Sequence, residues 1–122
     1  MLTAYKILAQ AAVSSDSSFA ETLYTCPASP AAGDASRRRS QVLVSSIVVC
    51  NKNASSARTY AIKVVPSGEV SADKHILFND RSLTAKGTEI SSMGIGHQPG
   101  DKILVHAQTA DICISMFGIE MV

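Results

Sequence analysis

Residues 41–50 read Gln-Val-Leu-Val-Ser-Ser-Ile-Val-Val-Cys and form a long strand-like run. Side chains of a β-strand alternate between two faces, and valine and isoleucine favour strands. The residues on one face are Val42, Val44 and Val48, and those on the other are Leu43, Ile47 and Val49. A strand that is apolar on both faces is either central in the protein or covered by another chain.

Residues 112–120 repeat this two-sided pattern. The alternating sets are Ile112, Ile114 and Met116 on one face, and Cys113, Phe117 and Ile119 on the other. Each sheet of a two-layer sandwich has only one inner face, so the second apolar face indicates a contact between chains. We therefore expect a homo-oligomer. The candidate interface residues in these two strands are Val42, Val44, Ile112, Ile114, Phe117 and Ile119.

Strand-like runs recur every ten to fifteen positions and are separated by Gly, Pro, Asn, Asp and Ser. Eight such runs are present, at residues 5–10, 19–25, 41–50, 58–65, 74–79, 88–93, 102–108 and 112–120. This spacing is typical of an all-β sandwich, and no run has the periodicity of an amphipathic helix. The sequence predicts an antiparallel two-sheet β-sandwich, jelly-roll-like or immunoglobulin-like, with about eight strands and essentially no helix.

The connections carry clear turn chemistry. Residues 51–57 and 109–111 are predicted to be hairpin loops, and residues 94–100 to be a turn rather than a nucleotide-binding loop. Residues 27–40 form one long irregular connection that contains Arg37, Arg38 and Arg39. Guanidinium groups suit interfaces with carboxylates, so these arginines join the candidate interface. The alternative is a solvated loop without a partner.

Size and charge limit the class of protein. The chain has 122 residues and a mass of 12.8 kDa, which predicts a single domain over residues 1–122. Its net charge is +1 and 17% of its residues are charged, so we expect no direct nucleic-acid partner. The N-terminal residues lack the pattern of a signal peptide, and the longest apolar run elsewhere is too short to span a bilayer. We expect synthesis in a cytosol and no membrane association.

The residues that carry chemistry are sparse and scattered. The cysteines at 26, 50 and 113 are far apart, which favours small buried side chains over a zinc site or a disulfide framework. The histidines at 75, 97 and 106 lack the spacing of a metal site, and no serine lies in a Gly-x-Ser-x-Gly motif. We expect a protein that is not an enzyme and has no catalytic residues, cofactor or metal.

Six segments resemble small virion structural proteins of tailed bacteriophages. They are YTCP at 24–27, VSSIVVCN at 44–51, ARTYAIKV at 57–64, ADKHILF at 72–78, GDKILVHA at 100–107 and DICISMFGIE at 111–120. The resemblance covers most of the chain except residues 27–40. It implies a structural subunit of the virion, made in the host bacterial cytoplasm. A capsid decoration or cement protein, or a neck, tail or fibre-attachment component, is implied, with the major capsid protein or neck and tail subunits as partners.

Two other classes of function stay open. A carbohydrate- or receptor-binding β-sandwich module of a phage fibre would need exposed aromatic rings. The chain has no tryptophan, and its tyrosines at 5, 24 and 60 are predicted to lie mostly on inner faces. A small hydrolase would need His, Asp and Ser side chains that converge in one pocket.

Overall fold

The computed structural model describes residues 3–13, 19, 21–27 and 41–121. The described residues form eight strands and one short 3-10 turn, η1 (Asp73–His75). The strands are β1 (Thr3–Ala12), β2 (Glu21–Thr25), β3 (Gln41–Asn51), β4 (Arg58–Val65), β5 (Ile76–Leu83), β6 (Thr88–His97), β7 (Lys102–Ala107) and β8 (Ile112–Met121). The predicted all-β sandwich with about eight strands and essentially no helix is confirmed.

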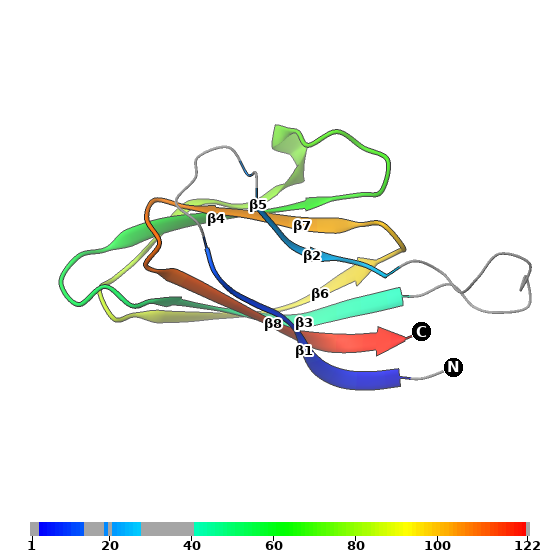
Figure 1. Cartoon of the computed structure of the whole chain (residues 1–122), viewed down its shortest axis with the longest axis horizontal. Coiled ribbons are helices and arrows are strands. Elements are labelled where there is room, and N and C mark those ends of the chain that lie inside the picture. Colours follow the sequence, from blue (N-terminus) through cyan, green and yellow to red (C-terminus); the bar gives the residue numbers. More distant parts are fainter. Residues whose placement is uncertain (1–2, 14–18, 20, 28–40, 122) are drawn as a thin grey trace, which may run out of the picture.

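The eight strands form two antiparallel sheets that pack face to face (Figure 1). Sheet A has the order β1-β8-β3-β6, and sheet B has the order β2-β7-β4-β5. Among these strands, only β4 and β5 are consecutive in the chain and neighbours in one sheet. This alternation between sheets is that of an eight-stranded jelly roll, whereas an immunoglobulin sandwich pairs consecutive strands within its sheets. Of the two predicted arrangements, the structure has the jelly roll.

Two predicted hairpin loops instead lead from one sheet to the other. The loop after β3 carries the chain from sheet A to β4 in sheet B, and the residues after β7 carry it back from sheet B to β8. Polar turn residues mark where a strand ends, but they do not determine which strand becomes its neighbour. The predicted turn at 94–100 is also shorter than expected, because β6 continues to His97.

A β-bulge in β3 explains why both faces of this strand read as apolar. The register with β8 and with β6 shifts between Val44 and Ser46. A bulge adds one residue, so the side chains beyond it change faces relative to strict alternation. Val42, Val44, Ile47 and Val49 therefore all point into the core, and each is at most 2% exposed. The apparent second face of β3 is largely the same inner face, continued past the bulge.

Four residues predicted at an intermolecular interface lie in the core instead. Val42 and Val44 of β3 and Ile112 and Ile114 of β8 are buried between the two sheets. The facing side chains of sheet B cover them, so no second chain is needed to remove them from water. That part of the predicted interface is wrong.

One end of the sandwich is held together by hydrogen bonds between its loops. The buried Asn51 side chain donates to the carbonyl oxygens of Ser56 (3.0 Å) and Leu83 (3.1 Å). Asp111 accepts from Asn53 (3.0 Å) and from the Arg58 guanidinium (3.1 Å). The hydrogen bond from Asn53, followed by that from Arg58, holds the pKa of Asp111 below its ordinary value. These hydrogen bonds connect the loops at the end of the sandwich where the chain passes between the two sheets.

Candidate functional site: the outer face of sheet A

The chain covers part of the outer face of sheet B, over β4 and β7, with its own residues. Ala61 and Lys63 of β4 point away from the core, yet both are buried. The Phe19 ring lies against His106 of β7 with centroids 4.2 Å apart, and the Lys63 ammonium is 4.3 Å from the centroid of the same ring. Lys63 also donates to Ser71 (3.0 Å), which belongs to the connection that lies outside sheet B in Figure 1.

The outer face of sheet A is different, because no described element lies over it in Figure 1. The strand register aligns Tyr5 of β1, Ile119 of β8 and Leu43 of β3 in one row across three strands. Side chains opposite each other on neighbouring strands are in contact distance. Tyr5 is 65% exposed and Leu43 is 39% exposed, while Ile119 between them is half-buried. This row is therefore a continuous apolar strip open to solvent.

A second row lies beside the first. Ile7 of β1 faces Phe117 of β8, and Phe117 faces Ser46 of β3. Ile7 is 54% exposed and Phe117 is half-buried. We call the residues of the two rows that are apolar or aromatic, namely Tyr5, Ile7, Leu43, Phe117 and Ile119, the apolar face.

A polar contact holds the Tyr5 ring across this face. The Tyr5 hydroxyl and the Ser45 hydroxyl are 2.9 Å apart, although Tyr5 is on β1 and Ser45 is on β3. Because β8 lies between these strands, the ring of Tyr5 extends over β8. Ser45 in turn donates to the carbonyl oxygen of Phe117 (3.3 Å). The aromatic ring is thus positioned before any partner binds, which lowers the entropy cost of binding.

Gly118 permits the two flanking strands to approach β8 at this point. β1 has a register irregularity between Ile7 and Ala9, and β3 has its bulge at the same level of β8. A Cβ atom on Gly118 would lie 2.1 Å from the carbonyl oxygen of Leu43 and 3.0 Å from a methyl group of Leu8. The Leu8 side chain could move aside, but the contact with the Leu43 carbonyl is impossible without movement of the backbone. A glycine is therefore required where the apolar face is built.

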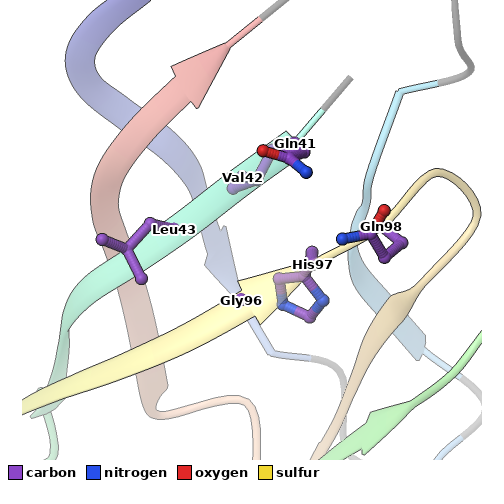
Figure 2. Close-up of a pocket in the computed structure, with 6 residues that line it drawn as sticks. All are labelled: Gln41, Val42, Leu43, Gly96, His97 and Gln98. Atoms are coloured by element: carbon purple, nitrogen blue, oxygen red, sulfur yellow. The ribbon is translucent and has the colours of Figure 1, made fainter. Parts of the chain in front are cut away.

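A pocket adjoins the apolar face at the ends of β3 and β6. It has a volume of about 290 Å³ and is lined by Gln41, Val42, Leu43, Gly96, His97 and Gln98 (Figure 2). Leu43 belongs both to this pocket and to the apolar face. Neither ring nitrogen of His97 has a hydrogen-bond partner among the described residues, and its distance to Asp101 Oδ2, 3.9 Å, exceeds a hydrogen bond. Burial lowers the pKa of His97, so the imidazole is neutral near pH 7.

Polar groups close the same end of the sandwich between the sheets. Glu120 pairs with the Lys6 ammonium at 2.7 Å and accepts a hydrogen bond from the Tyr24 hydroxyl at 3.0 Å. The contact with Lys6 holds the pKa of Glu120 below its ordinary value, and burial raises that of Tyr24. Burial also raises the pKa of Cys26 to about 11, so its thiol stays protonated. These groups stabilise one another in their ordinary ionisation states at neutral pH.

The structure brings together only part of the predicted interface. Phe117 and Ile119 lie on the apolar face, whereas Arg37, Arg38 and Arg39 lie outside the described residues. Tyr5, Ile7 and Leu43 are additional members that were not among the predicted interface residues, and Tyr5 is one tyrosine that lies on an outer face. The alternation Tyr5-Lys6-Ile7 is a signal for a shared face, but it does not show which face is buried.

The described residues contain no group of three or more His, Cys, Asp or Glu side chains that could hold a metal ion. In the described ranges, no helix is both long and apolar enough to cross a membrane. Comparison with protein-family models, with curated proteins and with solved structures finds no match for the chain.

Proposed function

We propose that the protein is a non-enzymatic structural subunit of a tailed-bacteriophage virion that assembles through the apolar face of sheet A. In this proposal it is a capsid decoration or cement protein, or a neck or tail accessory subunit. Its partners are further copies of itself and the major capsid protein or the neck and tail subunits. The observation that carries the proposal is the row formed by Tyr5, Ile119 and Leu43, which is apolar, ordered and uncovered.

Burial of this face would supply the free energy of assembly. Removing apolar surface from water is worth roughly 25 cal/mol per Å², and exposed apolar patches rimmed by polar groups commonly mark interaction sites. Aromatic residues such as Tyr5 and Phe117 contribute strongly to such contacts because they bury large areas with few rotatable bonds. A sheet face presents the same row of side chains in every copy, which suits a repeated contact in a symmetric particle.

Jelly rolls occur in viral capsid domains and also in lectins, so the fold by itself does not distinguish the two classes. The second candidate is accordingly a carbohydrate- or receptor-binding module of a phage fibre. The 65% exposure of Tyr5 favours it, since an exposed ring can stack on a sugar. The amide side chains of Gln41 and Gln98 at the nearby pocket are of the kind that bind sugar hydroxyls.

Sedimentation of matched variants tests assembly. Ile119→Asp introduces a charge at the centre of the apolar face and should weaken self-association at least about tenfold. Leu77→Asp is the control, because Leu77 is 48% exposed on sheet B, away from that face. Should Ile119→Asp fold poorly, Ile7→Asp changes a side chain that is more exposed. Equal association constants for wild type and both apolar-face variants would contradict the proposal.

Titration with sugars separates the two candidates. Chemical-shift changes at Tyr5, Gln41 and Gln98 in a panel of bacterial surface oligosaccharides would favour the receptor-binding module. A structural subunit should show none of these changes, while its self-association still depends on Ile119.

A further inference from the structure

Two cysteines that are 63 positions apart in the sequence face each other in sheet A. Cys50 of β3 is the register partner of Cys113 of β8. Both thiols are free and partly exposed. Cys50 alternates with buried Val49 and Asn51, and Cys113 alternates with buried Ile112 and Ile114, so both side chains point to the outer face. The pair was not expected from the sequence, which suggested three buried, unrelated cysteines.

Backbone hydrogen bonds identify the type of this cross-strand pair. Just past the ends of β3 and β8, Lys52 donates to the carbonyl oxygen of Asp111 (2.9 Å), and this pair is two register positions from Cys50 and Cys113. The Asn51 N–H points away from β8 and donates to the carbonyl oxygen of Gly87 (2.9 Å), the residue before β6. Hydrogen-bonded and non-hydrogen-bonded pairs alternate in an antiparallel ladder, so Cys50 and Cys113 form a hydrogen-bonded pair.

This pair type places the two thiols within reach of each other. Its Cα atoms are about 5.5 Å apart, which lies inside the range of about 4.4–6.8 Å found for disulfides. The Cβ atoms of such pairs lie at the wide end of about 4.5–5.5 Å, whereas a disulfide prefers about 3.5–4.5 Å. A bond can therefore form with a small approach of the strands. Such a bond is strained, and strained disulfides are reduced more easily than structural ones.

The surroundings leave the pair open to reagents. The row across sheet A at this level consists of Ala12, Cys113, Cys50 and Thr88, whose flanking side chains are small. Leu43 of the apolar face is seven residues away along β3, which is a distance of about 20 Å. A partner bound over the apolar face would be centred far from the two thiols.

We propose that Cys50 and Cys113 form an oxidisable dithiol that closes reversibly into a cross-strand disulfide through exchange with a small-molecule disulfide such as oxidised glutathione. The thiolate of one cysteine attacks the glutathione disulfide, forms a mixed disulfide and releases one glutathione thiolate. The second cysteine, as its thiolate, then attacks the protein sulfur of that mixed disulfide and releases the second glutathione thiolate. The two cysteines lose two electrons and two protons, and oxidised glutathione gains them as two thiols.

The closed form joins β3 to β8, the two central strands of sheet A. The bridge would be open in reducing compartments and closed in oxidising ones. This inference does not depend on the proposed function, because it concerns only the strand register and the exposure of the two thiols.

Mass spectrometry of the full-length protein after incubation with oxidised glutathione tests the inference. The expected product is a monomer lighter by two hydrogen atoms, in which peptide mapping links Cys50 to Cys113. After denaturation, an alkylating reagent should label Cys26 alone. Reduced glutathione in excess should restore labelling of all three cysteines.

Single variants provide the controls. Cys26→Ser should close as the wild type does, whereas Cys50→Ser and Cys113→Ser should each retain a glutathione adduct on the remaining outer cysteine. Three results would overturn the inference: glutathione adducts on both outer cysteines without a link, a link that includes Cys26, or a disulfide only between two chains.

Discussion

The outer faces of the two sheets differ in how far other parts of the chain cover them. Sheet B carries a lysine and a histidine on that face, and the chain lays Phe19 and the connection around Ser71 over them. Sheet A carries Tyr5, Ile7 and Leu43 on the corresponding face, where these side chains are exposed. A monomer that optimised its own stability would cover the apolar face first, because burial of apolar surface is the more favourable. The difference supports the proposal that another molecule covers the apolar face.

The largest expected effect concerns the shape of sheet A. Gly118→Ala should lower the free energy of unfolding by about 3 kcal/mol or more, because its Cβ would overlap the Leu43 carbonyl oxygen. Gly96→Ala is the matched control, since no atom lies within 4 Å of a Cβ at that position of β6. Urea denaturation measures both. If the two substitutions have equal effects, the close approach of β3 to β8 does not exist in solution.

Substitutions on the two outer faces should affect stability and self-association differently. Phe19→Ala should lower the free energy of unfolding by about 1–2 kcal/mol, because it uncovers His106 and removes the contact with Lys63. Its self-association should be unchanged.

Tyr5→Ala should show the reverse behaviour. It should cost less than about 1 kcal/mol of stability, since the side chain is 65% exposed, and it should weaken self-association about tenfold or more. Denaturation and sedimentation together check both variants. Loss of assembly in Phe19→Ala but not in Tyr5→Ala would reverse the assignment of the two faces.

The smallest expected effect concerns the pH dependence at the pocket. Burial lowers the folded-state pKa of His97, while nearby Asp101 raises it in part. A group with a lowered folded-state pKa favours folding above its unfolded-state pKa, about 6.5 for histidine, and this contribution is lost as the pH falls. Stability should therefore decrease below about pH 6.5, with a slope of at most about 1.4 kcal/mol per pH unit for one proton.

His97→Met keeps a side chain of similar size and removes the proton site. Its unfolding free energy should be flatter than that of the wild type between about pH 5 and 6.5. Asp111, whose pKa is also lowered, changes stability only around and below about pH 4. Denaturation at a series of pH values separates the two groups. Parallel curves for wild type and His97→Met would show that His97 is not buried in solution.

The sequence predicts the strands of this protein well because the alternation of apolar residues is local. All eight runs became strands, and the polar connections fell between them. The bulge at Ser45 could not be predicted, because the register with two distant strands defines it. Strict alternation therefore placed Ile47 and Val49 on the face of β3 opposite to Val44. The strand then appeared to have two apolar faces, and for this reason the core residue Val44 was assigned to an interface.

The candidate site was predicted only in part for the same reason. Phe117 and Ile119 alternate with core residues of an unbulged strand, so their outward position follows directly from the pattern. Tyr5 and Leu43 become part of the same face only through pairing with Ile119. The meeting of Cys50 and Cys113 is likewise a property of the jelly-roll order, which places the third and the last strand side by side.

The proposed contact through the apolar face can be observed in a cryo-electron microscopy reconstruction of the phage particle that is proposed to contain the protein. The map should show repeated copies of the jelly roll in which Tyr5, Leu43 and Ile119 are covered by a neighbouring copy or by another virion protein. The outer face of sheet B should remain on the solvent side. A map in which the apolar face of sheet A is open to solvent in every copy would contradict the account.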